Sequence, residues 1–183
     1  MVLWLDVETT GLDPKKHSII QIGALITKRA NGKVIDSFND TCDIIPGDEI
    51  DPYAMKVNGI DPDVLKHRQT SHKMFALFMD WLELHRGGKY LCAGYNVRFD
   101  IDYLMRWSAR LDMHDLRHYI KRNGVDVMNL VITYEALDKI GPFENHKLTT
   151  VARAMNVKLS GHDAYSDIKA THKIFRKLTG IRP

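Results

Sequence analysis

The sequence predicts an α/β domain built on a central mixed β-sheet. Two observations carry this prediction. Short apolar runs with a hairpin signal occupy the chain up to residue 44, and large apolar residues at helical spacing dominate thereafter. Hairpin strands followed by strands that alternate with helices are typical of an α/β domain. At 183 residues, the chain has the length of one domain with a sizeable core.

Three strands are expected in the first part of the chain. Residues 2–7 form a short apolar run with the length and flanks of a buried strand, and residues 18–27 form a second one. Asn31 and Gly32 lie between basic residues and are a good hairpin signal. Residues 34–44 then alternate loosely in polarity, as a third, antiparallel strand does. We therefore expect a three-stranded antiparallel meander.

The remainder of the chain alternates between helix and strand signals. Large apolar residues recur at helical spacing over residues 74–82, 99–107 and 168–178. Residues 90–93 form a short apolar strand, and residues 125–128 are a candidate for another. These later strands are expected to join the meander in one mixed sheet.

Composition and charge exclude several classes of protein. The chain is 44% hydrophobic and 27% charged, which is typical of a globular protein and excludes disorder. The longest apolar run is far shorter than the roughly 20 residues of a membrane span, and we expect no signal peptide because the sequence reaches Asp6 at once. Cys42 and Cys92 lack a CxxC spacing, so we expect a cytoplasmic protein without disulfides or zinc. The net charge of +3 suits a nucleic-acid partner but does not identify one.

Asp6 and Glu8 lie two residues apart on the first predicted strand. Their side chains therefore leave the same face of the sheet, and Val7 points the other way, into the core. Pairs of this kind usually belong to a solvated strand edge. This strand is otherwise wholly apolar, which indicates a central position where two carboxylates are costly to bury. A bound cation would remove that cost.

Three further residues lie where apolar runs meet turns. Asp100 follows the 90–93 strand and falls in the first turn of the next helix, where it either interacts with the helix dipole or serves a site. Asn96 is a candidate cap for that helix. His162 precedes a helix that begins near residue 163 or 164, and Asp167 lies about one turn into it. The imidazole of His162 and the carboxylate of Asp167 can therefore reach the same site.

Four carboxylates that converge beside one histidine are the residues that metal-assisted phosphodiester hydrolysis requires. The carboxylates would hold divalent cations, and the histidine would deprotonate a water. Ligation that is rich in oxygen and has one histidine favours Mg²⁺ or Mn²⁺ over zinc. The other eight histidines show no such context and are interpreted as surface or packing residues.

Three segments resemble the exonuclease motifs of the DEDDh (DnaQ-like) family of 3′–5′ exonucleases. This family contains proofreading subunits of replicative polymerases, ribonuclease T and oligoribonuclease. The segments are LDVETTGLDP at 5–14, GYNVRFD at 94–100 and HDAYSD at 162–167. Their order and spacing agree across nearly the whole chain, and residues 55–65 and 147–155 resemble further family segments. The histidine five residues before the last aspartate distinguishes this subgroup.

The resemblance implies a ribonuclease H-like fold, which is a five-stranded mixed sheet flanked by helices, with the first three strands antiparallel. It implies a single exonuclease domain over residues 1–183 and two divalent cations, Mg²⁺ or Mn²⁺. The implied ligands are Asp6, Glu8, Asp100 and Asp167. His162 would take a proton from the attacking water and completes the five expected catalytic residues. Tyr95 stands where many relatives have histidine, so substrate contacts near it are expected to differ.

The resemblance also places the 3′-terminal nucleotide of a substrate against the first two motifs. The implied substrate-binding residues are Thr9, Thr10, Gly11, Leu12, Asn96 and Phe99. Thr10 and Gly11 would offer backbone N–H groups, and Leu12 would wedge against a base. Asn96 and Phe99 are weaker candidates, and the helical spacing of Phe99 fits a core residue equally well.

Basic residues near the motifs are candidates for contact with the phosphate backbone. They are Lys15, Lys16, Arg98, Arg117, Lys121 and Arg122, with the last three expected on a later helix. Charge runs are usually solvated faces, so each cluster is an open alternative. Binding of a single strand needs few charges together with stacking surfaces, for which a net charge of +3 is sufficient.

The expected function is a metal-dependent 3′–5′ exonuclease that removes 5′-mononucleotides from the 3′ ends of single-stranded or frayed DNA. One alternative is a 3′–5′ exoribonuclease that trims RNA ends or degrades oligoribonucleotides. A second alternative is a non-catalytic module that binds nucleic acid or a polymerase. The expected partner is a single-stranded 3′ end, with DNA favoured over RNA. The resemblance also allows a polymerase or a second copy of the chain as a partner, and no membrane is expected.

Overall fold

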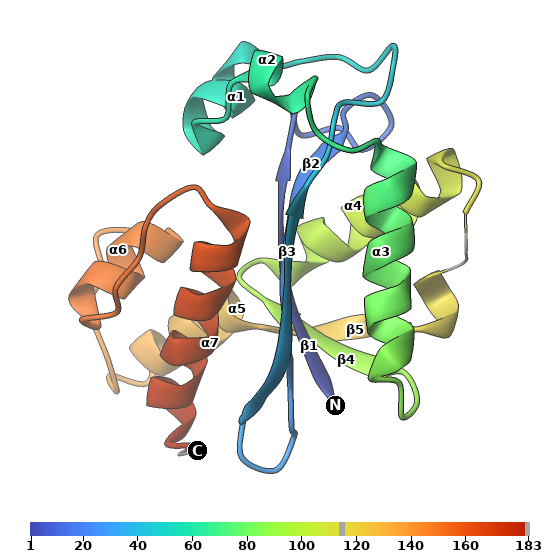
Figure 1. Cartoon of the computed structure of the whole chain (residues 1–183). Helices are drawn as coiled ribbons and strands as arrows, with labels where there is room; N and C mark the ends of the chain where they lie inside the picture. Colours follow the sequence, from blue (N-terminus) through green and yellow to red (C-terminus); the bar gives the residue numbers. More distant parts are fainter. Residues whose placement is uncertain (114–115, 182–183) are drawn as a thin grey trace.

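The computed structural model describes residues 1–113 and 116–181. Five strands form one sheet in the order β3-β2-β1-β4-β5 (Figure 1). Antiparallel ladders join β1 to β2 and β2 to β3, and parallel ladders join β1 to β4 and β4 to β5. The strands are β1 (Val2–Thr9), β2 (Ile19–Thr27), β3 (Val34–Thr41), β4 (Tyr90–Gly94) and β5 (Ile120–Asp126). This topology confirms the predicted fold class.

Helices cover both faces of the sheet. α3 and α4 lie on one face and α5, α6 and α7 on the other, while α1 and α2 lie beyond one end of the β1–β3 meander (Figure 1). The helices are α1 (Pro52–Asn58), α2 (Pro62–Leu65), α3 (Ser71–Leu84), α4 (Val97–Arg110), α5 (Val127–Ala136), α6 (Leu148–Ala154) and α7 (Ala164–Thr179), and η1 (Leu116–His118) is a 3₁₀ turn. Within residues 1–113 and 116–181, no helix has the length and apolarity needed to cross a membrane.

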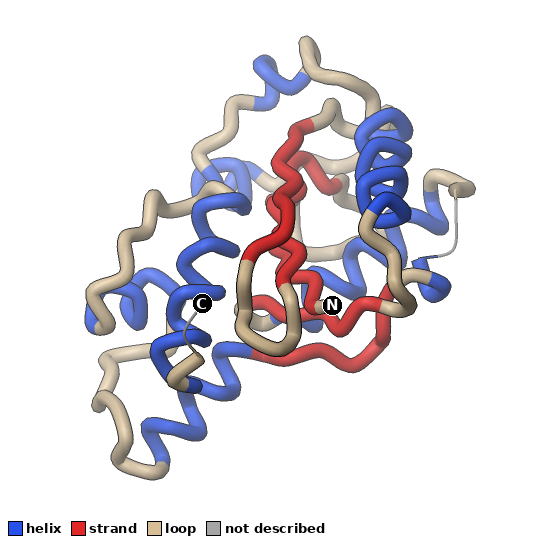
Figure 2. Tube along the Cα trace, turned by 60° about the horizontal axis from the view of Figure 1, so that its bottom comes forward, coloured by secondary structure: helices blue, strands red, loops and turns tan. Residues whose placement is uncertain are grey.

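The alternation of side chains along β1 divides the core into two clusters. Leu3, Leu5 and Val7 are buried with residues of α3 and α4 on one face. Trp4 is buried with residues of α7 on the opposite face, and the sheet runs between the two helical layers (Figure 2). Because successive side chains of a strand alternate between faces, Asp6 shares the face of Trp4. The predicted inward orientation of Val7 is confirmed.

The predicted meander forms with small differences at its ends. Gly32, in the connection between β2 and β3, has a φ of 65°, a conformation that glycine adopts without strain. β3 ends at Thr41, three residues before the predicted end at residue 44. Cys42 still donates its N–H to the Ile20 carbonyl of β2 at 3.1 Å, and it also forms an isolated parallel bridge with Gln69.

The fifth strand lies earlier in the chain than predicted. It spans Ile120–Asp126, whereas the apolar pattern indicated residues 125–128. Asp126 ends the strand and caps α5, since its Oδ1 accepts a hydrogen bond from the Met128 N–H at 3.0 Å. Residues 121–124 are exposed on this edge strand and carry no apolar signal that would mark them as a strand.

The basic residues of this region are placed differently as well. Lys121 and Arg122 were expected on a helix and lie in β5. Arg117 lies in η1, a single 3₁₀ turn. The helical expectation was wrong for Lys121 and Arg122 because charged residues on an exposed strand carry no periodicity that distinguishes a strand from a helix.

Candidate active site

The second half of β1 has room for a side chain beside it. The parallel register of β1 with β4 covers Val2–Trp4, and beyond Gly94 the chain turns away into α4. The backbone N–H of Val7 donates a hydrogen bond to Asp100 Oδ1 at 3.0 Å. Asp100 comes from the first turn of α4 and is 3% exposed. Its carboxylate therefore takes the place that a strand partner would occupy.

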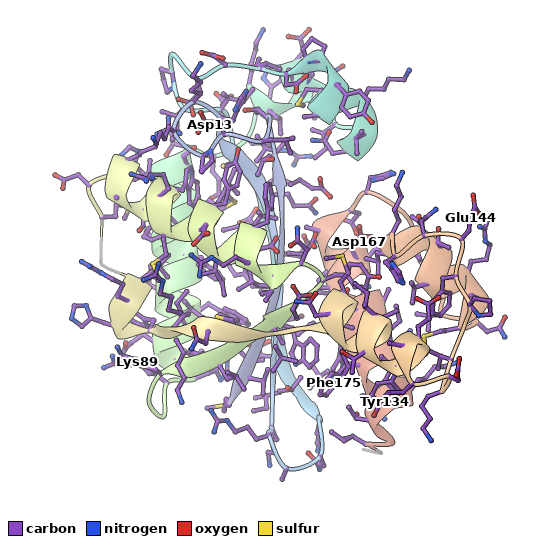
Figure 3. All side chains as sticks on the ribbon, turned by 180° about the vertical axis from the view of Figure 1, so that it is seen from behind. Asp13, Lys89, Tyr134, Glu144, Asp167 and Phe175 are labelled. Carbon is purple, nitrogen blue, oxygen red and sulfur yellow. The ribbon has the colours of Figure 1, made fainter. Side chains whose placement is uncertain are left out.

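Three of the predicted acidic residues converge at this end of β1. Carboxylate oxygens of Asp6, Glu8 and Asp167 lie within 4.8 Å of one another. Asp167 comes from the first turn of α7 and is labelled in Figure 3. Its Oδ1 is buried and has no hydrogen-bond partner among the described residues. The sequence prediction that these three side chains meet is thus matched by the geometry.

A glycine on β2 allows α7 to approach the sheet so closely. Gly23 pairs with Asp6 across the β1–β2 ladder. A Cβ atom at Gly23 would lie 2.4–2.5 Å from backbone atoms of Ala164 and Tyr165. The first turn of α7 therefore rests directly on β2, and it carries Asp167 against β1. A glycine inside an otherwise apolar strand is a sequence signal of such close contact, and Gly23 was not among the predicted site residues.

Asp163 is a further acidic residue of this region and was not among the predicted site residues. Its side chain caps α7 by accepting a hydrogen bond from the Ser166 N–H at 2.9 Å. It also accepts one from Gln21 Nε2, on β2, at 2.6 Å. These bonds hold the start of α7 against the sheet. Aspartate is a residue type that commonly caps a helix, whereas the bond to Gln21 joins positions 142 residues apart and leaves no local signal.

Burial makes these carboxyl groups hard to ionise. Burial, followed by the charges of Asp167 and Asp163, raises the pKa of Glu8 to about 8. Burial also raises the pKa of Asp100 to about 8, partly offset by the Val7 N–H, and that of Asp167 to about 7. The pKa of Asp6 is raised well above its usual range by burial and then by the Asp100 carboxylate. Without a counter-ion the cluster therefore retains protons near neutral pH.

This donor set fits a hard divalent cation. It consists of carboxylate oxygens, which Mg²⁺ and Mn²⁺ prefer. The buried Asp167 Oδ1, which has no partner in the described part of the chain, is an available ligand atom. A cation would also relieve the repulsion that raises the pKa values. Asp6, Glu8 and Asp167 are thus the residues that could hold a metal, with Asp100 beside them.

His162 lies in the loop before α7, next to the capping Asp163. Its side chain is exposed, and its φ is 59°. Among the described residues, the group of neighbouring metal-ligand atoms consists of Asp6, Glu8 and Asp167 and does not include this imidazole. The exposed position leaves it accessible from solvent, and its role as a base stays a prediction.

The turn after β1 is built differently from one expectation. Thr10 is fully buried, and its N–H donates to the Ser18 carbonyl at 2.9 Å. The Thr10 N–H was expected to meet a substrate. This expectation was wrong, because the N–H is already bonded to the Ser18 carbonyl. Thr9 Oγ1 donates to the Gly11 carbonyl at 2.7 Å, which tightens the turn. Leu12 is 77% exposed, and a side chain that wedges against a base must be accessible in this way.

Two side chains hold this turn from other parts of the fold. Tyr103, buried on α4, donates its hydroxyl to the Gly11 carbonyl at 2.5 Å. Asn58, buried at the end of α1, donates from Nδ2 to the Thr9 carbonyl at 3.2 Å. Neither residue was selected from the sequence. Both act on the backbone that carries Leu12, so they are positioning residues of the candidate site.

The second motif also differs from expectation in its detail. Asn96 occupies the N-cap position of α4 with a φ of 60°, but its side chain makes no capping bond. Its N–H instead donates to Asp126 Oδ1 at 3.0 Å, which holds the turn in the left-handed region that asparagine tolerates. Phe99 is partly buried against the core, with its ring centroid 4.9 Å from that of Tyr103. The alternative interpretation of Phe99 as a packing residue is therefore supported.

Tyr95, the departure from the family pattern, has a structural partner. Its hydroxyl donates to the His146 carbonyl at 2.6 Å. The His146 ring in turn contacts Glu135 of α5. Tyr95 therefore ties the turn of the second motif to the segment that precedes α6.

Comparison with known proteins identifies relatives of this chain. The family model RNase_T, described as Exonuclease, matches residues 3–175. The DNA polymerase III PolC-type of Caldanaerobacter subterraneus subsp. tengcongensis is 30% identical over 176 residues, which cover 94% of this chain and 11% of that protein. The corresponding protein of Thermotoga maritima is 29% identical over 156 residues, which cover 81% of this chain and 11% of that protein. The chain thus spans only a small part of these relatives.

Solved structures of E. coli exonuclease I share the fold. The complex of that enzyme with a dT13 oligonucleotide has a TM-score of 0.82 at 22% identity, covering 98% of this chain and 41% of that chain. The zinc-bound form of its complex with single-stranded DNA has a TM-score of 0.83 at 22% identity, covering 98% and 40%. At this level of identity the similarity concerns the fold.

Proposed function

The chain belongs to the RNase_T exonuclease family, and on this premise we propose that it is a metal-dependent 3′–5′ exonuclease. One observation carries the proposal. The carboxylates of Asp6, Glu8 and Asp167 converge at the end of a central strand, and Oδ1 of Asp167 is buried there without a partner in the described part of the chain. A module that only binds nucleic acid has no need for such a costly cluster.

The proposed cofactors are two divalent cations, Mg²⁺ or Mn²⁺. Asp6, Glu8 and Asp167 would hold them, and Asp100 would contribute beside them. When bound, such cations activate a water and stabilise charge on the phosphate. His162 is exposed in the loop before α7, the helix that carries Asp167, and would accept the proton of that water. Its imidazole must be neutral to do so.

The substrate would lie across the turn after β1. Leu12 would wedge against a base, and the Gly11 backbone would face the terminal nucleotide. Thr9 would contribute through the turn that its hydroxyl braces, and Asn96 and Phe99 would border the same place. Tyr103 and Asn58 hold the two carbonyls of this turn and so set its position. A free 3′-hydroxyl fits this arrangement, because a 3′-phosphate adds charge next to an acidic cluster.

DNA is the proposed substrate, with single-stranded or frayed 3′ ends and 5′-mononucleotides as products. The PolC-type relatives are DNA polymerases by name, and the E. coli exonuclease I structures hold dT13 or single-stranded DNA. By the same likeness, a polymerase chain is a candidate partner. Residues 1–183 would act as a single exonuclease domain, which the family match over residues 3–175 supports.

Matched 5′-end-labelled DNA and RNA oligonucleotides test this function directly. With Mg²⁺ or Mn²⁺, the DNA should shorten from its 3′ end in single-nucleotide steps, and chelator should stop the reaction. A DNA that ends in a 3′-phosphate should resist digestion. Internal fragments would contradict exonuclease action, and RNA digestion at least about tenfold faster, 1.4 kcal/mol in barrier, would overturn the assignment of DNA.

A further inference from the structure

A groove with a volume of about 1240 Å³ runs between α4 and β5. Its charged lining is mostly basic. The basic residues are Lys89, Arg98, Arg106, Arg117, Lys121 and Arg122, and the acidic ones are Asp102 and Asp112. α4 and β5 pack side by side, and Figure 3 shows them running from the side on which Lys89 is labelled toward Asp167. We call this feature the α4–β5 groove.

Three of the six basic residues in the α4–β5 groove lie in exposed positions without a carboxylate partner in the described part of the chain. Arg98 pairs with Asp102, with Nε and Oδ2 2.6 Å apart. Arg106, Lys121 and Arg122 are exposed, and within the described residues none of them forms an ion pair. Cations that converge without carboxylate partners attract a polyanion.

A bulge in the edge strand lies beside its basic residues. Tyr90 pairs with Ile120 but Cys92 pairs with Gly124, so β5 carries extra residues opposite β4. Such a bulge redirects the side chains of the bulged strand. Lys121 and Arg122 are neighbours that a regular strand would point to opposite faces, yet both line the groove. Protection of an edge strand by charge would not require both residues to line one groove.

The α4–β5 groove shares helix α4 with the candidate active site. Arg98 and Ile101 line it and flank Asp100 in the first turn of α4. Pro14, from the segment that follows Leu12, lines it as well. α4 has 14 residues and is therefore about 21 Å long. A strand that follows α4 would have its end at the acidic residues and several phosphates along the basic side chains.

We propose that the α4–β5 groove binds the phosphate backbone of the single strand behind its 3′-terminal nucleotide. This inference rests on the proposed exonuclease function for the position of the 3′ end. The groove then holds the strand by charge, and the turn after β1 holds its terminal nucleotide. Binding of this kind is independent of base sequence and weakens with salt.

The test compares two double variants with the unmodified protein. Lys121→Gln with Arg122→Gln removes charge from the groove. Lys158→Gln with Lys173→Gln removes charge from a second basic surface at α7, and both lysines are exposed. All four residues are exposed, so thermal melting should show intact folding. Fluorescence anisotropy in chelator measures the affinity for oligodeoxynucleotides of about 4 and about 16 nucleotides.

The groove variant should bind the long oligomer at least about tenfold more weakly, and the slope of log affinity against log salt should decrease by about 1.4, or about 0.7 for each lost contact. The affinity of the groove variant for the short oligomer should stay unchanged. The control variant should bind both oligomers as the unmodified protein does. The proposal that the groove binds the strand would be overturned by any of three results. These are unaltered binding of the long oligomer, an equal loss of affinity for both lengths, and an equal loss in the control variant. Because binding is measured without cations, an inactive protein would refute the proposed function and leave this test intact.

Discussion

Trp4, Asp6 and Glu8 follow one another on the same face of β1, but only Trp4 suits the apolar layer beneath α7. The carboxylate of Asp167 lies against the other two, within 4.8 Å. Carboxylates this close repel each other when ionised. Perturbed groups of this kind in a natural protein indicate a site at which binding, rather than stability, determines the residues.

Replacement of Asp6 by asparagine tests this conflict. Asp6→Asn keeps the size of the side chain but removes an ionisable ligand, so turnover should fall below detection. At about pH 9, where the neighbouring carboxylates are ionised, the melting temperature in chelator should rise because one source of repulsion is lost. Asp80→Asn is a matched control, because Asp80 is exposed on α3. Digestion of labelled DNA and thermal melting measure the two effects. An Asp6→Asn protein with full activity would exclude the metal site.

His162→Ala tests the proposed base. In the proposed reaction this imidazole accepts the proton of the attacking water. The variant should lose on the order of 10²–10⁴-fold in rate while its fold stays intact. His67→Ala, at an exposed residue of the α2–α3 connection, should leave the rate unchanged. A variant with the original rate would remove His162 from the reaction.

Tyr103→Phe tests whether the turn after β1 positions substrate. The variant keeps the ring in the core and removes the hydroxyl that the Gly11 carbonyl accepts. We expect a loss of about 0.5–1.5 kcal/mol in stability and a several-fold rise in KM for oligonucleotides. Tyr90→Phe is the control, since its buried hydroxyl donates to the Leu82 carbonyl at 2.8 Å. Equal changes of KM in both variants would show a general loss of stability.

The residues that could be recognised from the sequence are those that conflict with their surroundings. Asp6 and Glu8 stand out as carboxylates on an apolar strand. Tyr103 looks like a core residue, and its bond to Gly11 joins positions 92 residues apart. The buried N–H of Thr10 could not be anticipated either, because its partner Ser18 is determined by the path of the connection to β2.

The secondary-structure elements were predictable to the extent that one face of each is buried. The apolar patterns of β1, β2 and α4 reflect packing on the core, and the periodicity indicated them. β5 was displaced in the prediction because its first residues are exposed at the sheet edge. Strand order and the approach of α7 to β2 depend on contacts between distant segments, which periodicity does not describe.

Gly23→Ala tests that approach. The added Cβ would meet the Ala164 and Tyr165 backbone at 2.4–2.5 Å, so the first turn of α7 must shift and carry Asp167 away from Asp6. We expect a loss of about 1–3 kcal/mol in the free energy of unfolding and a larger loss of activity than stability alone explains. Chemical denaturation and labelled-DNA digestion measure the two.

Gly87→Ala is the matched control for this substitution. A Cβ at Gly87 would have no heavy atom within 4 Å. The variant should keep its activity, and its stability should change by less than about 1 kcal/mol. If Gly23→Ala behaved in the same way, the close packing of α7 on β2 would not be what positions Asp167.

Across the whole molecule, the candidate site joins both helical layers to the central strand. Asp6 and Glu8 come from β1, Asp167 from α7 on one face, and Asp100 from α4 on the other. Formation of the site therefore requires the complete fold. Its charges in turn affect the stability of the entire protein, because these groups bind protons differently in the folded and unfolded chain.

The direction of this effect follows from the pKa values. Burial raises the pKa of Glu8 from 4.5 to about 8 and that of Asp167 from 3.8 to about 7. Asp100 changes in the same sense, from 3.8 to about 8. Between the unfolded and folded values, the folded chain holds protons that the unfolded chain has released. The metal-free protein should therefore become less stable as the pH rises from about 4 to about 8.

Thermal melting in chelator at about pH 5 and about pH 8 measures this loss, and Glu8→Gln should reduce it because the amide does not titrate. Mg²⁺ or Mn²⁺ binds the ionised carboxylates of the folded chain, so the rise in melting temperature that the cation produces should be larger at the higher pH. At the lower pH, the cation competes with protons for the same oxygens. A melting temperature that rises with pH over this range, or a cation effect that is equal at both values, would show that Glu8, Asp100 and Asp167 do not act as one proton- and metal-linked group.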